Sequence, residues 1–247
     1  ANARLDRQAL ELQRSNAELE QFAYVASHDL QEPLRMVSSF VDLIGERYGD
    51  RLDERGRAYV SFAVDGARRM QRLVQDVLEY AELSQHPVTR HRVDLVGVAA
   101  NAIAELRLAE EAPAATVTVG DLPVLQGDEV LLMRVFRNLV SNAVKFARED
   151  HPAVVRLDAR RGHEEWVLSV EDEGIGIPDR FVERVFRMFA RLQPRDRFPG
   201  SGIGLAICQQ AVAAHGGRIW VEQPESGVGT RICFTIPDHP TAPGLHP

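Results

Sequence analysis

The spacing of apolar residues changes once along the chain, and this change restricts the folds that the chain can adopt. Up to about Leu83 apolar residues recur at the spacing of a helix, whereas residues 154–159 and 166–172 alternate as half-buried strands do. Residues 84–95 contain a proline and break the helical period, so they are predicted to form a linker leading into a first strand. The sequence therefore predicts a helical region followed by a mixed α/β region.

The helical region begins with a heptad repeat. Apolar residues recur every seven positions at Leu5, Leu12, Leu19 and Ala26, and a second seam holds Ala9, Asn16, Ala23 and Leu30. This pattern predicts a two-stranded coiled coil in which Asn16 sets the register. A single amphipathic helix packed on its own domain is the alternative.

Two long helices are predicted to follow as a hairpin. The polar segment 49–56 separates a first helix from a second one that runs from about Arg57 to Leu83. Each helix has one apolar face, and two such hairpins can bury these faces against each other as a four-helix bundle.

His28 lies on the first helix of this hairpin. The apolar residues from Phe22 to Ile44 fall within one sector roughly 120° wide, and His28 points away from that sector into solvent. Asp29 could orient or deprotonate the imidazole and make its other nitrogen a better nucleophile. Pro33 removes a backbone hydrogen bond nearby, which suggests a bend. A solvated polar face is the alternative interpretation.

The second region is predicted to be a two-layer α/β sandwich with a mixed, largely antiparallel sheet. Its expected helices span 96–111, 128–148 and 203–214, and its expected strands lie within 116–127, 154–159, 166–172, 218–222 and 231–236.

Composition excludes several classes of protein. The 247 residues carry a net charge of −7, which argues against a nucleic acid or an anionic membrane as partner. The two cysteines, Cys208 and Cys233, have no metal-binding spacing, which is typical of a reducing, cytoplasmic setting. There is no apolar run of about 18 residues that could span a membrane and no signal peptide, so we expect a piece of a longer cytoplasmic chain.

Three pairs of glycines in the second region suggest a binding site. They lie in DEGIGIP (172–178), GSGIGLA (200–206) and GVGT (227–230). Neither GxxxxGK[ST] nor GxGxxG occurs, so a P-loop or a Rossmann nucleotide site is not supported. Glycines that merely form turns are the alternative for any single pair.

The residues around these glycines suit a nucleotide. The second pair runs into an apolar helix, whose first N–H groups and positive dipole end attract phosphate. Asp172 ends a strand before a glycine turn, where its carboxylate can accept a hydrogen bond from an amine such as that of adenine. Asn138, Asn142 and Lys145 share one helix face, and an amide oxygen beside a lysine suits Mg²⁺ and phosphate.

Six segments, taken in order, resemble the motifs of the transmitter portion of a sensor histidine kinase. They are FAYVASHDLQEPLR (22–35), the phosphoacceptor box; NLVSNAVKF (138–146), the asparagine box; VEDEGIGIP (170–178), the first glycine box; VFRMFARL (185–192), the phenylalanine box; GSGIGLAI (200–207), the second glycine box; and GVGTRICFTIP (227–237), the closing glycine segment. The family's GHKL-type ATP-binding fold is shared by type II topoisomerases, heat-shock chaperone ATPases and mismatch-repair ATPases. The resemblance covers roughly residues 15–237 and implies five parts: a coiled-coil signalling helix (1–20), a dimerisation and phosphotransfer hairpin (21–84), a linker (85–93), a catalytic ATP-binding domain (94–237) and a disordered tail (238–247).

The resemblance also implies roles for individual residues. His28 would accept the γ-phosphoryl group of ATP, and Asp29 would activate it. Asn142 would bind Mg²⁺, with Asn138 nearby and Lys145 on the phosphates.

The remaining implied roles concern the nucleotide. Asp172 would recognise adenine, and residues from about 191 to 199 would form a short mobile lid. The other nucleotide-binding positions would be Gly174, Gly176, Gly200, Gly202, Gly204 and Thr230.

The function implied is that of a homodimeric, ATP- and Mg²⁺-dependent protein-histidine kinase of a two-component system. It would phosphorylate His28 and pass the group to an aspartate on the receiver domain of a response regulator. A GHKL-type ATPase clamp without phosphotransfer and a signalling scaffold with decayed kinase activity are the alternatives.

Two details of the phosphoacceptor box qualify this expectation. HDLQEPLR (28–35) resembles the branch attached to phytochrome or PAS-type sensors, which implies such a sensor domain upstream. Glu32 stands four residues after His28, where many family members carry Thr or Asn that aids dephosphorylation of the partner. This departure puts phosphatase activity by that route in question.

Overall fold

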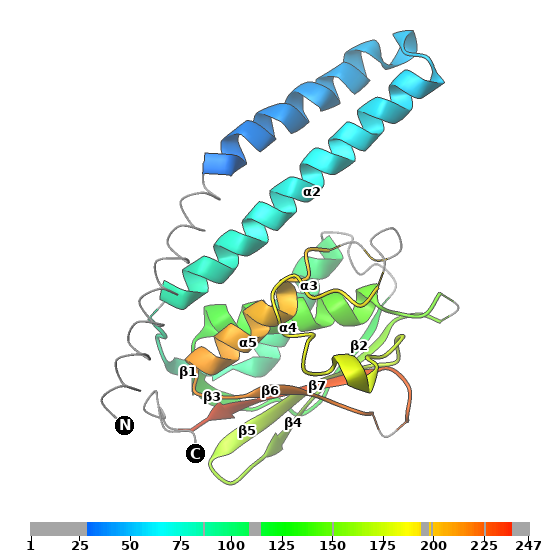
Figure 1. Ribbon diagram of the computed structural model, residues 1–247. Coiled ribbons are helices and arrows are strands. Elements are labelled where there is room, and N and C mark those ends of the chain that lie inside the picture. Colours follow the sequence, from blue (N-terminus) through cyan, green and yellow to red (C-terminus); the bar gives the residue numbers. More distant parts are fainter. Residues whose placement is uncertain are drawn as a thin grey trace, which may run out of the picture. The chain divides into compact units, whose positions relative to one another are not determined.

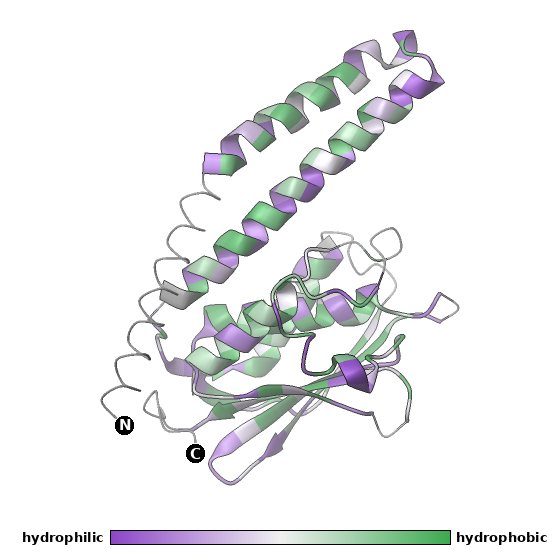
Figure 2. Cartoon of the chain, viewed as in Figure 1, coloured by the Kyte–Doolittle hydropathy of each residue, from purple (hydrophilic) through white to green (hydrophobic). Residues whose placement is uncertain are grey.

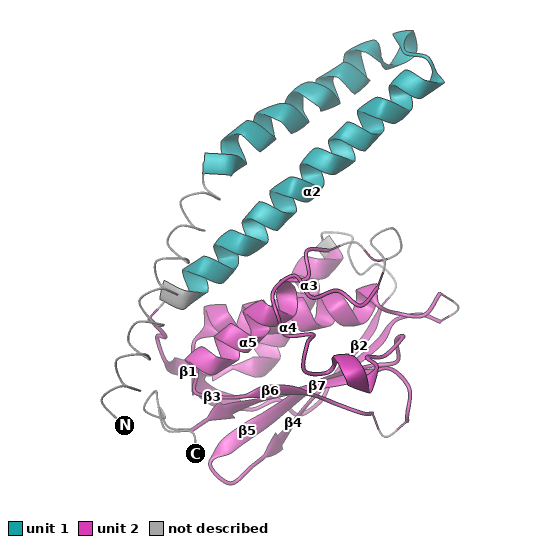
Figure 3. Cartoon of the chain, in the orientation of Figure 1, with its two compact units in different colours: residues 1–85 teal, residues 86–247 magenta. Residues whose placement is uncertain are grey.

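The chain forms two compact units, residues 1–85 and 86–247 (Figure 3). The computed structural model describes residues 29–85, 87–108, 115–149, 151–193, 198, 200–224 and 226–238. The predicted coiled coil (1–20) and His28 lie outside these residues. Within them, no helix is both long enough and apolar enough to cross a membrane.

The first unit is a helical hairpin, as predicted. A helix over residues 29–48, the short 3₁₀ turn η1 (Gly49–Arg51) and α2 (Glu54–Gln85) follow one another, and the two long helices run antiparallel (Figure 1). The start of α2 is held because the Asp53 carboxylate accepts from the backbone N–H of Gly56 at 2.7 Å. Helix 29–48 continues through Pro33, so the bend proposed there remains a hypothesis.

The hairpin buries only a narrow seam and leaves much apolar surface outside it. Ala67 on α2 is 1% exposed, and Ser38 on the first helix is 7% exposed. Figure 2 shows hydrophobic residues recurring along both helices. The large apolar side chains exposed on this unit are Leu30, Met36, Val37, Phe40, Leu43, Ile44, Tyr48, Tyr59, Phe62 and Met70. An exposed apolar face of this length marks an interaction surface.

The second unit contains a five-stranded sheet in the order β2-β4-β5-β7-β6. Its strands are β2 (Thr116–Val119), β4 (Val154–Arg161), β5 (Glu165–Asp172), β6 (Ile219–Glu222) and β7 (Thr230–Pro237). β2 pairs with β4 in parallel and all other pairs are antiparallel, so the sheet is mixed and largely antiparallel, as predicted. The register between β5 and β7 places Asp172 opposite Thr230.

Three helices cover one face of this sheet and complete the two-layer sandwich (Figure 1). They are α3 (Leu95–Leu108), α4 (Glu129–Lys145) and α5 (Gly204–Ala214). The buried face of α4 includes Phe136, whose ring meets that of Phe234 on β7 edge-on at 6.0 Å. Aliphatic and aromatic side chains at helical spacing on α4 and at alternate positions on β5 and β7 thus form one core.

Two smaller elements flank this core. β1 (His91–Asp94) pairs antiparallel with β3 (Val124–Gly127), and η2 (Asp179–Phe181) precedes the phenylalanine-box segment. β1 lies partly within the segment expected to be a linker (85–93). Asp238, the first residue of the expected disordered tail (238–247), is held by Arg161 at 2.8 Å. The boundaries of the five predicted parts remain predictions.

Candidate functional site

Helix α4 presents the predicted polar face beside the core. The Asp128 side chain caps its first turn by accepting from the backbone N–H groups of Val130 and Leu131. Asn138, Asn142 and Lys145 are half-buried on the face opposite the buried side chains, which include Leu132, Phe136, Leu139 and Ala143. The side-chain NH₂ of Asn138 donates to the Arg134 carbonyl at 2.9 Å, and the side-chain oxygen of Asn138, Oδ1, lies towards Gly204.

The second glycine segment passes directly over this polar face. A Cβ atom on Gly204 would lie 2.7 Å from Asn138 Oδ1, and one on Gly200 would lie 2.6 Å from Lys145 Nζ. Gly200 and Gly202 also have φ values of 149° and 79°, which side-chain-bearing residues rarely adopt. Because these positions are glycine, no side chain of the segment displaces the asparagine or the lysine.

The N-terminus of α5 opens at the same place. Its N-cap residue, Ile203, makes no side-chain cap, and the N–H groups of the first turn of a helix can bind an anion. This 11-residue helix starts beside Asn138, and the glycine segment that precedes it passes Lys145, so the segment offers both a positive dipole end and a positive charge. The predicted phosphate-binding residues on α4 and in the second glycine segment are thus brought together.

Asp172 ends β5 in a half-buried position with one oxygen already engaged. Its Oδ1 accepts from the backbone N–H groups of Gly174 at 2.8 Å and Thr230 at 3.2 Å. Burial raises the pKa of this carboxyl to about 6, against the lowering effect of the two hydrogen bonds. A carboxyl with a pKa raised in this way beside a glycine turn is a functional-site candidate.

The glycines around Asp172 keep the surrounding backbone close. A Cβ on Gly174 would lie 2.4 Å from the Phe146 carbonyl oxygen, and one on Gly229 would lie 1.8 Å from the carbonyl oxygen of Asp172. Gly176 has a φ of 76° and lies against Gly229. The first glycine box, the closing glycine segment and the end of α4 therefore converge at Asp172.

Several contacts of this site were not predicted from the sequence. The Phe146 ring packs on the buried Phe198 ring at 5.1 Å, and Lys145 Nζ lies 4.5 Å from the centre of the Phe146 ring. Arg191 donates to the carbonyls of Gly200 and Phe198. Phe146 belongs to the asparagine box, and Phe198 and Arg191 belong to the expected lid, but no individual role was predicted for them. Much of the expected lid (191–199) lies outside the described residues.

The phosphoacceptor end of the chain is described only in part. His28 lies outside the described residues, and Asp29 begins the described part of the first helix, where it is exposed. Asn142 lies between Asn138 and Lys145 along α4. No cluster of three or more His, Cys, Asp or Glu side chains suited to a metal occurs in the described part of the chain.

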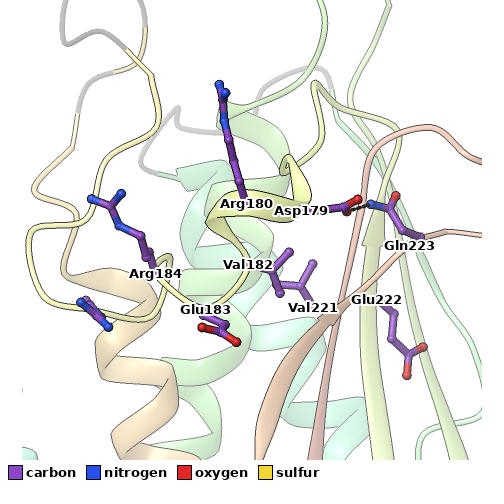
Figure 4. Close-up of a pocket in the computed structure, with 9 residues that line it drawn as sticks. Asp179, Arg180, Val182, Glu183, Arg184, Val221, Glu222 and Gln223 are labelled. Atoms are coloured by element: carbon purple, nitrogen blue, oxygen red, sulfur yellow. Dashed lines mark hydrogen bonds between the residues drawn. The ribbon is translucent and has the colours of Figure 1, made fainter.

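A separate open pocket of about 670 Å³ lies between η2 and the end of the edge strand β6 (Figure 4). Asp179 accepts from the side chain of Gln223 at 3.0 Å on its rim, and Arg180, Arg184 and Arg187 contribute positive charge. None of the predicted nucleotide-binding residues lines it. We therefore do not assign it to the nucleotide.

Comparisons with known proteins match both units. Residues 18–86 match the family model of the His Kinase A (phospho-acceptor) domain, and residues 127–240 match that of the Histidine kinase-, DNA gyrase B-, and HSP90-like ATPase. Phytochrome-like protein Cph1 of Synechocystis sp. is 42% identical over 93% of this chain. The chain spans 30% of the length of that relative.

Solved structures of histidine kinases share the fold. Full-length ShkA in complex with AMPPNP matches 90% of this chain and 46% of its own at a TM-score of 0.66 and 27% identity. The mycobacterial sensor histidine kinase MprB matches 62% of this chain and 100% of its own at a TM-score of 0.52 and 30% identity. With the two family models covering the hairpin and the sandwich in order, the chain belongs to the sensor histidine kinases, as a transmitter module with a GHKL-type catalytic domain.

Proposed function

We propose that this chain is the catalytic portion of a two-component sensor kinase that phosphorylates His28 with ATP and then transfers the phosphoryl group to an aspartate of a response regulator. The observation that carries the proposal is the convergence of α4 with the second glycine segment. There Lys145 meets Gly200 and Asn138 meets Gly204, beside the uncapped start of α5. The two family models support the first step, because one describes a phosphoacceptor domain and the other an ATPase.

The phosphates would lie on the glycine segment. The first N–H groups of α5 would bind phosphate oxygens, and Lys145 would offset their negative charge. The missing side chain of Gly200 leaves the space beside Lys145 Nζ that a phosphate oxygen requires. The amide oxygen of Asn142 suits Mg²⁺, which when bound would neutralise charge on the phosphates.

The base would lie against Asp172. Because two backbone N–H groups hold Oδ1, the other oxygen, Oδ2, is the acceptor for the exocyclic amine of adenine. Gly174 and Gly176 let the ring approach the backbone closely. This arrangement selects adenine over a base that carries a carbonyl at the same position.

Transfer to His28 needs alignment more than covalent assistance. The unprotonated imidazole nitrogen would attack the γ-phosphorus while the bond to the bridging oxygen breaks and ADP leaves. Asp29 would orient the ring and take up the proton of its other nitrogen. The acid follows His28 directly in the sequence.

The active species would be a homodimer. The hairpin exposes Phe40 (64%) and Phe62 (72%) on its two helices, and a second copy would cover them in a four-helix bundle. The 42% identity with the phytochrome-like protein Cph1, of which this chain spans 30%, supports a phytochrome-like sensor upstream.

Incubation with γ-labelled ATP and Mg²⁺ tests the proposal. The unaltered chain should take up label in a linkage that is stable to base and labile to acid, and both His28→Gln and Asn142→Ala should abolish it. ATP hydrolysis without label on the chain would instead favour the ATPase clamp. Failure to bind Mg·ATP would favour the scaffold.

A further inference from the structure

A group of four residues, which we call the junction (Thr89, Arg90, Asp128 and His215), connects three parts of the ATP-binding domain. It lies where the chain enters the domain, where α4 begins and where α5 ends. Asp128 is 3% exposed and His215 is fully buried. Buried polar groups of this kind are stable only when their hydrogen bonds are satisfied, so the contacts of the junction define one geometry.

Asp128 binds two of these parts with its two carboxylate oxygens. Oδ1 caps α4 through the N–H groups of Val130 at 3.1 Å and Leu131 at 3.3 Å. Oδ2 accepts from the backbone N–H of Thr89 at 2.9 Å. The cap of α4 and the anchor of the entering segment are therefore the same side chain.

His215 lies at the end of α5, the third part, and its contacts hold the imidazole ring in a single tautomer. Its Nδ1 lies 2.8 Å from the Ala211 carbonyl oxygen and must carry the proton, so Nε2 accepts from the backbone N–H of Asp128 at 2.9 Å. Arg90 donates to the His215 carbonyl and to that of Pro237. Burial lowers the pKa of His215, and Arg90 lowers it further, which keeps the ring neutral.

At the nucleotide site the start of α5 meets the middle of α4. α5 begins at Gly204, whose backbone lies against the side-chain oxygen of Asn138 on α4. Asn138 lies ten residues beyond Asp128, which is about 15 Å along a helix. The two helices are thus joined at the junction and again at the proposed phosphate site, so a shift at one end moves the other.

We propose that His215, through the backbone N–H of Asp128, is a positioning residue for the nucleotide site, and that the Asp128 side chain, through Thr89, couples that site to the segment by which the chain enters the domain after α2. His215 sets α5 against α4, so that Asn138 and Lys145 face the glycine segment. The Thr89 contact fastens the entering segment to the same point. The coupling to the entering segment rests on the proposed kinase function. The positioning of the nucleotide site does not, because it concerns nucleotide affinity alone.

The first test measures Mg·ATP affinity of the full chain after substitution of His215. His215→Leu removes the acceptor for the Asp128 N–H, whereas His215→Gln offers an amide oxygen in its place. We expect the dissociation constant to rise about tenfold in the leucine variant, as the loss of one hydrogen bond can cause, and to return to within about threefold in the glutamine variant. A leucine variant that unfolds at a lower temperature but binds Mg·ATP as the unaltered chain does would overturn the proposal.

The second test separates the cap from the anchor at Asp128. Serine caps a helix as well as aspartate does but is too short to reach Thr89 as well. Asp128→Ser should keep Mg·ATP affinity within about twofold and slow His28 labelling at saturating Mg·ATP at least fivefold, roughly the effect of ~1 kcal/mol. Asp121→Ser, at an exposed aspartate outside the junction, is the matched control.

The outcomes of the two tests are distinct. Labelling and affinity both unchanged in Asp128→Ser would contradict the coupling. If the unaltered chain binds Mg·ATP but takes no label on His28, the proposed kinase function fails, and the His215 variants still decide whether the junction positions the nucleotide site.

Discussion

The substitution Asp172→Asn tests how the site recognises the base. Both backbone N–H donors, from Gly174 and Thr230, go to Oδ1. In the variant they would keep the amide oxygen in that place and turn the amide nitrogen towards the position of Oδ2. A donor would then face the exocyclic amine of adenine, although the volume and the loop contacts are retained.

The expected loss follows from the hydrogen bond that disappears. A hydrogen bond to a charged acceptor contributes about 1.5–3 kcal/mol, so the dissociation constant for Mg·ATP should rise roughly 10- to 150-fold. Inosine triphosphate carries a carbonyl in place of the amine, and its affinity should not fall in the variant. Glu171→Gln is the matched control, because Glu171 pairs with Arg231 at 3.6 Å instead.

The pH dependence gives an independent measure of the same contact. With a pKa of about 6, Asp172 is ionised above that pH and protonated below it. Because the amine binds the ionised form, affinity should be constant above pH 6 and fall by up to about tenfold per pH unit below it. Asp172→Asn removes this dependence and corrects for titration of the nucleotide itself.

Isothermal titration calorimetry of both nucleotides from pH 5 to 8 would measure these effects. The assignment of Asp172 to adenine is refuted if Asp172→Asn binds Mg·ATP within about twofold of the unaltered chain and keeps the same preference over inosine triphosphate.

Three further predictions concern the phosphate site, the dimer and the buried histidine. Gly204→Ala should lower Mg·ATP affinity by displacing Asn138 while leaving the thermal midpoint unchanged or higher, since alanine favours a helix by up to ~1 kcal/mol. Replacing Phe40 and Phe62 by serine should weaken the dimer at least 100-fold in analytical ultracentrifugation, because burying each phenylalanine contributes about 1.5–3 kcal/mol. The folded state holds His215 neutral with a pKa below 6.5, whereas the unfolded chain protonates near 6.5. The free energy of unfolding, measured by denaturant titration, should therefore decrease as the pH falls below 6.5.

Each of these predictions has its own control and its own contrary outcome. Full Mg·ATP affinity in Gly204→Ala would remove Asn138 from the phosphate site. Val96→Ser changes an exposed apolar residue of the other unit and should leave the dimer intact, so equal weakening would contradict the hairpin interface. In His215→Gln the decrease in the free energy of unfolding below pH 6.5 should be smaller than in the unaltered chain. The same pH dependence in both would show that other groups cause the decrease.

The sequence predicted the order of elements because periodicity reports which face of each element is buried. The hairpin, α4 with its polar face, the strand that ends at Asp172 and the strand expected at 231–236 all follow from that pattern. The approach of the second glycine segment to α4 followed only from the resemblance to a family. No local pattern states that Gly200 lies beside Lys145, because the two residues are brought together by the packing of α5 on α4.

Other features of the site depend on contacts between residues distant in sequence. The pairing of β1 with β3 joins strands of four residues each, which are too short for a clear alternation. His215 precedes two glycines in the sequence, which does not indicate its partner, because its bond to Asp128 links positions 87 residues apart. Contacts of this kind depend on tertiary packing, which overrides local preference.

The site of phosphorylation tests the central claim most directly. After incubation of the full chain with Mg·ATP, mass spectrometry of peptides kept at neutral or basic pH would locate the phosphoryl group. We predict a single phosphohistidine at His28, and none in a chain that carries Asn142→Ala. Phosphate on any other residue, or ATP turnover with His28 unmodified, would contradict the assignment of this helical hairpin as the acceptor for the nucleotide site.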